Sequence, residues 1–344
     1  MKGTLTMTQQ HWHPGNLLEL SGYFWKTATL HAAVKLDVFS VIGDLQLSDK
    51  EIAVRTGTDT GAMERLLDAL AAMEMIYKDK TLYSNTDAAR KFLSKSSSEY
   101  IGHMIMHHHY LVDLWQRLDE SVKTGAPARK WPSTSETTHV DDSEREAFLM
   151  GMFNNASLTA PNLVKQVDLG PRRKLLDMGG GPGTYAIYFC KQYPDLNATV
   201  FDLPATRPFA EKIISTFDMA DRINFEEGSY LERGQDLPGM YDVIWMSHIL
   251  HGEGDEDCRQ MIEKAYRAME PGGMIIIHEL ILDETKTKPL FPALFSLNML
   301  LATEDGRSYT ESELSGMLEK AGFTDINRLD YSGPSQSGIL TATK

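Results

Sequence analysis

Cysteine is scarce in this sequence. The 344 residues include two cysteines, Cys190 and Cys258, which lie far apart in segments with helical character. Two cysteines are too few for a disulfide framework or for a cysteine-based zinc site. We therefore expect a protein of the reducing cytoplasm.

Long apolar runs and an excess of positive charge are also missing. No uninterrupted apolar run approaches the roughly 18 residues that a membrane span needs, and residues 1–15 lack the apolar core of a secretory signal. Lysine and arginine number 34 against 48 acidic residues, which gives a net charge of −14. Such a surface repels nucleic-acid phosphates and anionic membranes, so we expect neither as a partner.

The front part of the chain has a helical pattern. Apolar residues recur at helical spacing between residues 17 and 92, and the segment 48–83 resembles two helices and a small hairpin, as in a winged helix-turn-helix. Between Asp44 and Glu74, however, seven acids accompany three basic residues. A DNA-reading helix needs the opposite charge, so we favour a packing or dimerisation role.

A stretch rich in Pro, Gly, Ser and Thr at residues 122–143 interrupts this pattern and indicates an exposed connection. A helix is predicted to follow it, to about residue 167. We therefore predict a helical domain at residues 1–121, a connection with a linking helix at 122–172, and a second domain at 173–344.

Strand and helix signals alternate in this second domain, which is typical of a parallel sheet with helices on both faces. Seven strands are predicted, at residues 174–178, 198–201, 222–225, 241–246, 273–281, 323–329 and 338–343. The last two follow one another across a short connection and should form an antiparallel hairpin at the sheet edge.

A glycine-rich turn follows the first of these strands. Glycine at 179, 181 and 183 permits dihedrals that a side chain forbids and lets a ligand touch the main chain, just before a helix with unpaired amides. Asp202 ends the next strand, where a carboxylate suits a ribose diol. The pattern predicts a nucleotide-type cofactor site; a tight strand-to-helix turn without a ligand is the simpler alternative.

Nicotinamide dinucleotide fits this turn poorly, because its fingerprint places a third glycine where Thr184 stands. An adenosyl cofactor fits better. The Glu270-Pro-Gly-Gly273 turn before the fifth strand, together with Asp202, resembles the class I S-adenosylmethionine-dependent methyltransferases.

Three later motifs narrow the resemblance. They are Tyr241-Asp-Val-Ile-Trp-Met-Ser-His-Ile-Leu-His251, Asp255-Glu-Asp-Cys258 and Ile275-Ile-Ile-His-Glu-Leu-Ile-Leu282. With the helical front domain, they resemble the O-methyltransferase family of plant caffeate-type and bacterial acetylserotonin- and polyketide-type enzymes. The resemblance extends from about residue 17 to residue 343.

The resemblance implies an α/β fold with a Rossmann-like, mostly parallel seven-stranded sheet, an antiparallel last strand, and an N-terminal winged-helix-like dimerisation domain. It also implies S-adenosyl-L-methionine as cofactor and a homodimer. The cofactor contacts would fall on Gly179, Gly181, Gly183, Asp202, Leu203, Ser229, Tyr230, Met246 and Ser247. Ser229 stands in the stretch where the family has an adenine-side acid, so Ser229 or the backbone would contact the adenine amine.

The family's catalytic histidine falls on His251 and its first acidic partner on Glu279. Histidine suits a hydroxyl acceptor, whose proton must leave, because imidazole can act as a base near neutral pH. Glu279 would orient the ring and stabilise the imidazolium. A second acidic partner would fall near Ser308, where Glu304 or Asp305 could substitute.

Seven residues are predicted to line the acceptor pocket: Met152, Phe153, Asn155, His248, Phe295, Asn298 and Met299. Core packing is the alternative for the apolar members of this set. The pair His248 and His251 and the histidine-rich run at residues 103–109 could each suggest a metal. We predict no metal, because His248 more plausibly lines the pocket and the run has no obvious third ligand.

The expected function is therefore O-methylation of a hydroxyl on a small, aromatic metabolite. A C- or N-methyltransferase, or a decarboxylase or hydroxylase derived from the same fold, is the alternative enzyme. A ligand-sensing winged-helix regulator is a third possibility, which the acidic charge of the front domain disfavours.

Overall fold

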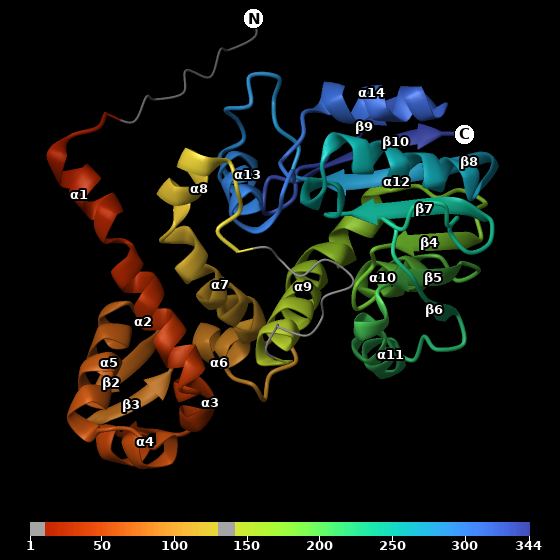
Figure 1. The fold of residues 1–344 in the computed structure, drawn as a ribbon. Coiled ribbons are helices and arrows are strands. Elements are labelled where there is room, and N and C mark those ends of the chain that lie inside the picture. Colours follow the sequence, from red (N-terminus) through yellow and green to blue (C-terminus); the bar gives the residue numbers. More distant parts are fainter. Residues whose placement is uncertain (1–10, 130–141) are drawn as a thin grey trace, which may run out of the picture. The chain divides into compact units, whose positions relative to one another are not determined.

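The computed structural model describes residues 11–129 and 142–344 (Figure 1). The chain divides into two compact units, residues 1–109 and 110–344. The division falls inside one continuous helix, α7 (Gly102–Trp115), and so lies before the boundary predicted at residue 121. Much of the predicted exposed connection, residues 130–141, lies outside the described residues.

The first unit is mainly helical. Its helices are α1 (Pro14–Gly22), α2 (Phe24–Lys35), α3 (Val38–Ile42), α4 (Asp49–Thr56), α5 (Thr60–Ala72) and α6 (Asp87–Leu93), and its strands are β1 (Leu47–Ser48), β2 (Ile76–Asp79) and β3 (Leu82–Asn85). Ser48 and Glu51 form a capping box at the start of α4. The β2–β3 hairpin follows α5, as the winged-helix pattern predicts.

A seven-stranded sheet forms the centre of the second unit. Its strands are β4 (Lys174–Met178), β5 (Asn197–Asp202), β6 (Ile223–Glu227), β7 (Tyr241–Ser247), β8 (Met269–Glu279), β9 (Thr324–Arg328) and β10 (Gly338–Thr343). They lie in the order β6-β5-β4-β7-β8-β10-β9. The first five are parallel and β10 is antiparallel to both of its neighbours, which confirms the predicted fold class.

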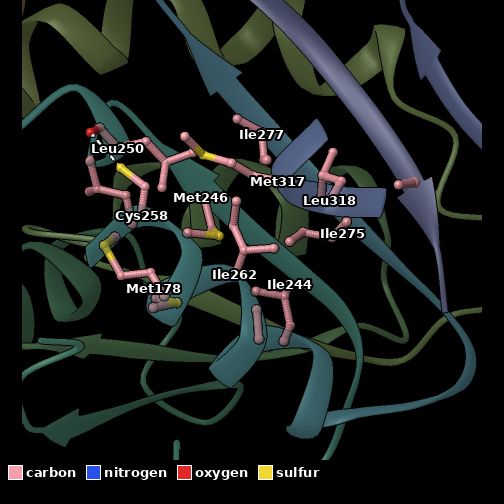
Figure 2. Close-up of a cluster of buried hydrophobic side chains, with 14 of the residues drawn as sticks. Met178, Ile244, Met246, Leu250, Cys258, Ile262, Ile275, Ile277, Met317 and Leu318 are labelled. Atoms are coloured by element: carbon pink, nitrogen blue, oxygen red, sulfur yellow. Dashed lines mark hydrogen bonds between the residues drawn. The ribbon is translucent and has the colours of Figure 1, made fainter. Parts of the chain in front are cut away.

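Helices cover both faces of this sheet (Figure 1). The helices of this unit are α8 (Leu118–Thr124), α9 (Asp142–Leu163), α10 (Thr184–Gln192), α11 (Arg207–Thr216), α12 (Asp255–Arg267), α13 (Leu290–Ala302) and α14 (Glu311–Ala321), with short 3-10 turns η1 (Val164–Gln166), η2 (Pro204–Thr206) and η3 (Leu250–Gly252). Of these, α8 packs on α13 and not on the sheet. Side chains alternate along each strand, so Ile244 packs with α12 and α14 while Trp245 packs with α9 and α10. Figure 2 shows the first of these clusters, including Met246 and Cys258.

The turn predicted before the fifth strand lies inside β8. Gly272 has a φ of +77°, and the pairing of β7 with β8 shifts register between Tyr241 and Val243. The glycines therefore form an irregularity within a longer strand. Among the described residues, no helix is both long and apolar enough to cross a membrane.

Candidate active site

The glycine turn after β4 needs glycine for two reasons. Gly179, Gly181 and Gly183 have φ values of +67°, +53° and +76°, which side-chain-bearing residues rarely adopt. A Cβ atom on Gly179 would also lie 2.7 Å from Cγ2 of Ile249. The turn therefore presents bare main chain at the start of α10, where a nucleotide-type cofactor fits.

Asp202 lies at the carboxyl end of β5, beside this turn. Its Oδ2 accepts from the Gly181 N–H at 2.7 Å, and its Oδ1 accepts from the Leu203 N–H at 2.6 Å and from the Thr206 hydroxyl at 3.0 Å. Burial raises the pKa of Asp202, while these donors oppose the shift. The structure thus brings together the glycine turn and the predicted ribose acid.

Asp177, inside β4, was not among the predicted site residues. It is fully buried, and burial raises its pKa to about 7. Its carboxyl group fills the space where a Cβ on Gly180 would lie and accepts from the Ala186 N–H at 3.2 Å. An acid in an otherwise apolar strand directly before the glycines was the signal that could have revealed it.

The loop after β6 lies against the glycine turn. A Cβ on Gly179 would meet the Tyr230 ring at 3.2 Å, and the Gly228 N–H donates to the Asp202 carbonyl at 3.0 Å. The Ser229 hydroxyl accepts from the Leu231 N–H at 3.2 Å. The loop that carries Ser229 and Tyr230 therefore lies beside Asp202 and the glycine turn, and the role of these two residues in cofactor binding stays a prediction.

His251 and Glu279 form a direct pair. His251 lies in η3 just after β7, and Glu279 is the last residue of β8, so the two parallel strand ends bring them together. His251 Nδ1 lies 2.8 Å from Glu279 Oε2. Burial would raise the pKa of Glu279, but the His251 ring and the other donors lower it to about 2. The carboxylate thus remains charged behind the ring.

The Glu279 carboxylate uses both oxygens fully. Oε1 accepts from the N–H groups of Leu250 at 3.0 Å and His251 at 3.4 Å, and Oε2 accepts from the Leu280 N–H at 3.0 Å in addition to His251 Nδ1. His248, His251 and Glu279 offer ligand atoms within 4.8 Å of one another. Because four donors already occupy the carboxylate, the group is organised to orient His251, and the absence of a metal stays a prediction.

His248 and Ser247 lie over a buried histidine. His248 has a φ of +56°, and its ring packs edge-on against His278 at 4.4 Å. Burial lowers the pKa of His248 to about 4. His278 lies between the Ser247 hydroxyl and the Ser337 hydroxyl, each 2.9 Å from a ring nitrogen. Met246 points the other way, into the core cluster, so only its main chain is available to a cofactor.

Helix α13 supplies the side chains beside His251. The Phe295 ring packs edge-on against the His251 ring at 4.8 Å. One turn later, Asn298 Oδ1 accepts from the Trp115 indole N–H at 3.0 Å, while Met299 is buried. Trp115 was not predicted, because nothing in its local sequence marks it.

The residues of α9 that were predicted to line the acceptor pocket lie in other surroundings. The Phe153 ring packs against Phe217 at 6.2 Å and joins the cluster under the sheet, so packing accounts for it. Asn155 is exposed, and Met152 is half-buried. The structure therefore does not bring Phe153 together with His251.

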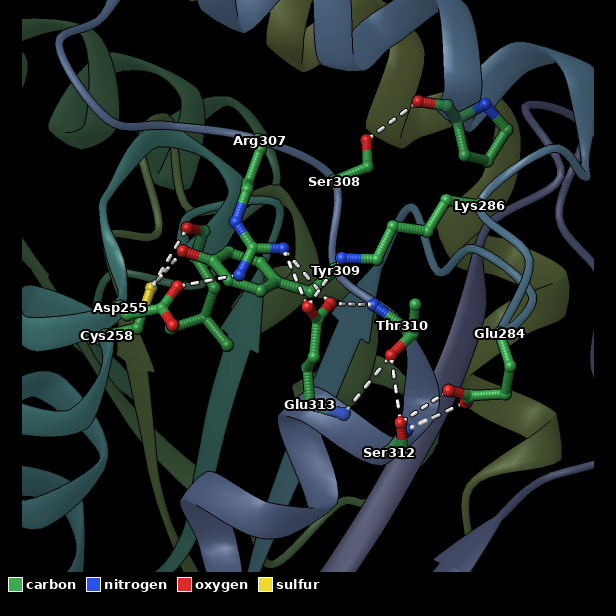
Figure 3. A network of polar contacts seen from close by, with 12 residues as sticks. Asp255, Cys258, Glu284, Lys286, Arg307, Ser308, Tyr309, Thr310, Ser312 and Glu313 are labelled. Atoms are coloured by element: carbon green, nitrogen blue, oxygen red, sulfur yellow. Dashed lines mark hydrogen bonds and ion pairs between the residues drawn. The ribbon is translucent and has the colours of Figure 1, made fainter.

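Ser308, where a second acid was expected, is a structural residue. It is 2% exposed and donates to the Pro292 carbonyl at 2.8 Å, which links its segment to α13 (Figure 3). Its neighbours hold the turn around His251: the Tyr309 hydroxyl donates to the Glu253 carbonyl at 2.6 Å, and Arg307 pairs with Asp255 at 2.7 Å.

Asp305, one of the two predicted substitutes for that acid, also lies near this turn. A Cβ on Gly254 would lie 2.8 Å from the Asp305 Cβ. Glu253 is a further acid that was not predicted; burial and Asp257 raise its pKa to about 7, against the opposing effect of His251.

The histidine-rich run belongs to α7 in the first unit. His109 lies 3.2 Å from Lys35 Nζ and packs edge-on against His31. Burial lowers the pKa of His107 to about 4. Within residues 11–129 and 142–344, the one group of three possible metal ligands is that of His248, His251 and Glu279.

Fold and site together define a methyltransferase-type α/β domain with a helical partner unit. Residues 115–324 match the O-methyltransferase domain, and residues 18–95 match the O-methyltransferase dimerisation domain. The chain belongs to the O-methyltransferase family. The match confirms the predicted family and enzyme class, and the cofactor of the family is S-adenosylmethionine.

Known proteins are similar to this chain over nearly its whole length. The chain is 31% identical over 332 residues to 3-hydroxy-5-methyl-1-naphthoate 3-O-methyltransferase of Streptomyces sahachiroi, covering 96% of this chain and 95% of that protein. It is 29% identical over 314 residues to the N,N-dimethyltransferase OxyT of Streptomyces rimosus, covering 90% of each. The structure of human N-acetylserotonin methyltransferase in complex with S-adenosylmethionine aligns with a TM-score of 0.83 at 25% identity, covering 98% of this chain and 99% of that one.

Proposed function

We propose that this S-adenosylmethionine-dependent O-methyltransferase acts on a hydroxyl group of a small aromatic metabolite, with His251 as general base. The observation that carries the proposal is the 2.8 Å contact between His251 Nδ1 and Glu279 Oε2. It favours the tautomer with hydrogen on Nδ1, which leaves Nε2 as the proton acceptor. The relative that acts on a hydroxynaphthoate supports an aromatic acceptor.

The cofactor would be held by the glycine turn, by Asp202 and by the loop around Tyr230. When bound, S-adenosylmethionine supplies an electrophilic methyl group on a sulfonium. His251 Nε2 would accept the hydroxyl proton of the acceptor as the acceptor oxygen is methylated. Glu279 stabilises the resulting imidazolium, and Phe295 packs against the ring that receives the proton.

A panel of hydroxylated aromatics tests the base. In the His251→Gln variant, we expect kcat for a hydroxyl acceptor to fall by about 100- to 10,000-fold, because the proton acceptor is lost. The dissociation constant of S-adenosylhomocysteine should stay within about twofold, because His251 is not part of the glycine turn. His11→Gln, on an exposed residue, is the matched control. Unchanged turnover in His251→Gln would contradict the proposal.

N-methylation is a second candidate, favoured by the similarity to OxyT. An amine can attack through its lone pair and lose its proton afterwards, so such an acceptor should tolerate His251→Gln. A matched phenol and aniline, compared in the wild type and in this variant, separate the two functions. C-methylation would appear as a carbon-methylated product in the same assay.

We also propose that the protein is a homodimer formed through the first unit. Large apolar side chains of α1 and α2 are exposed there, among them Leu18 at 74% and Trp25 at 70%. Exposed apolar residues of this density mark an interaction surface. Light scattering should give the mass of two chains; a monomer at micromolar concentration would contradict this assignment.

A further inference from the structure

The loop between β6 and β7 is held by helix α12 through consecutive main-chain carbonyls. Lys264 Nζ donates to the Tyr230 carbonyl at 2.9 Å and also to the Glu232 carbonyl. Gln260 Nε2, one helical turn away, donates to the Leu231 carbonyl at 3.2 Å. Two side chains of one helix thus fix three successive carbonyl groups.

Lys264 is an unusual residue for this position. It is 2% exposed, and lysine is rarely buried to this extent without a carboxylate partner. The Nζ partners here are main-chain carbonyls, which carry no compensating charge. Burial and the charge of Arg267 lower the pKa of Lys264, and the nearby acids Asp236 and Glu232 oppose the shift without hydrogen bonding to Nζ. An apolar side chain at this position would avoid the free-energy cost of burying an ammonium group. We therefore expect Lys264 to have a role that an apolar residue could not perform.

The amide groups of the same turn are fixed from inside it. The Leu231 N–H donates to the Ser229 hydroxyl at 3.2 Å, and the Glu232 N–H donates to the Ser229 carbonyl at 3.2 Å. With the carbonyls held by α12, both polar groups of the peptide bonds 230–231 and 231–232 have partners. The turn is therefore locked on both sides.

This locked turn lies against the cofactor site. The Tyr230 ring would be 3.2 Å from a Cβ on Gly179. Ion pairs that also join the loop to α12, such as Arg233 with Glu256 at 3.0 Å, are exposed and contribute little. Lys264, which is buried, and Gln260, which is half-buried, are thus the less exposed anchors of the loop.

We propose that Lys264 is a positioning residue that sets cofactor affinity by holding the turn Ser229–Glu232 against the glycine turn in the shape that receives adenine. This rests on the proposed assignment of Ser229 and Tyr230 to the adenine side of the site. Because Ser229 stands where an acid would otherwise contact the base, the backbone shape of the turn carries more of the recognition. That shape depends on Lys264.

Titration calorimetry on the full chain tests the proposal with two ligands, S-adenosylhomocysteine and 5′-methylthioadenosine, which lacks the amino-acid half. Lys264→Met keeps an unbranched apolar side chain as far as the Cε position and removes the ammonium group with its three donors. We expect this variant to raise the dissociation constants of both ligands by the same factor, about tenfold or more. The reason is that the turn would contact the adenosine half that the two ligands share. Gln260→Met should raise both dissociation constants by about threefold.

Kinetics give an independent measurement. In Lys264→Met, KM for S-adenosylmethionine should rise while kcat at saturating cofactor stays near the wild-type value, which a general loss of folded protein would not produce. Lys212→Met makes the same chemical change on the exposed face of α11 and should leave the dissociation constants of both ligands unchanged.

The outcomes are distinct. If the wild type binds neither ligand, the proposed cofactor site fails, and Lys264 is not the cause. If the wild type binds and Lys264→Met binds equally well, or loses affinity for S-adenosylhomocysteine alone, the positioning role is overturned. If Lys264→Met does not fold, Gln260→Met decides: a matched loss for both ligands supports the role, and unchanged affinity overturns it.

Discussion

The cofactor side and the acceptor side of this site are built from different material. The proposed cofactor side is mostly main chain: glycines with positive φ after β4 and the carboxyl ends of β5 and β6, with the Asp202 carboxylate and the Tyr230 ring beside them. The proposed acceptor side consists of side chains on helices, such as Phe295 and Asn298 of α13. Main-chain shape is dictated by residue type at a few positions, whereas side-chain contacts depend on how separate helices meet. The first side is therefore the more predictable one.

His251 and Glu279 lie where the two sides meet. Both follow from strand ends, because β7 and β8 are parallel neighbours, but their function depends on a side-chain contact. The position of the pair was therefore predictable from the strands, as on the cofactor side, whereas its function depends on side chains, as on the acceptor side. Changes to it should have the largest effects.

Glu279→Gln should break the contact that links the two sides. A neutral amide presents an NH2 group where the carboxylate accepts four donors, so His251 would lose its orienting partner. We expect kcat to fall by about 100- to 1000-fold, with cofactor affinity unchanged. The measurement is initial rate at saturating cofactor, together with calorimetry of S-adenosylhomocysteine.

Glu253→Gln is the matched control for that change. Glu253 is also an acid near His251, but burial and Asp257 raise its pKa to about 7, so it is a poorer source of negative charge. Its loss should reduce kcat by less than about fivefold. Equal losses in the two variants would mean that two acids share the orienting role.

Gly179→Ala should sharpen the claim that the cofactor side is made of main chain. The new Cβ would lie 2.7 Å from Ile249 and the residue has a φ of +67°, so the turn must move. We expect the affinity for S-adenosylhomocysteine to fall by about tenfold or more. Calorimetry on the folded variant gives the value.

Gly272→Ala separates the effect of backbone strain from the effect of changing the shape of the glycine turn. Gly272 has a similar φ of +77°, but a Cβ there would meet nothing within 4 Å. The substitution should lower the free energy of unfolding by about 1 kcal/mol and leave cofactor affinity unchanged. If both variants lost affinity equally, general strain rather than the shape of the turn would be responsible.

The sequence predicted the sheet well because its signals are local. The seven strands and the glycine turn each follow from residue types within a few positions. It also indicated the pairing of His251 with Glu279, through resemblance. Phe153 shows the limit: an aromatic on an amphipathic helix could face the pocket or the core, and only the packing of α9 on Phe217 decides.

Residues that act across large sequence separations were missed for the same reason. Lys264 supports a loop more than thirty residues away, and its sequence context is that of an ordinary amphipathic helix. Ser308 was expected near an acid's position, yet its hydroxyl holds α13. Neither role leaves a local pattern.

Trp115→Phe should have the smallest effect and tests the acceptor side alone. The change removes the indole N–H that donates to Asn298 at 3.0 Å but keeps an aromatic ring. Asn298 can then rotate its amide, so an acceptor that contacts it should show a rise in KM of about two- to fivefold. Trp12→Phe, on an exposed indole, should change nothing. Cofactor affinity should be unaffected by either, since the glycine turn is built without these residues; a loss of cofactor affinity in Trp115→Phe would show that the two sides are not independent.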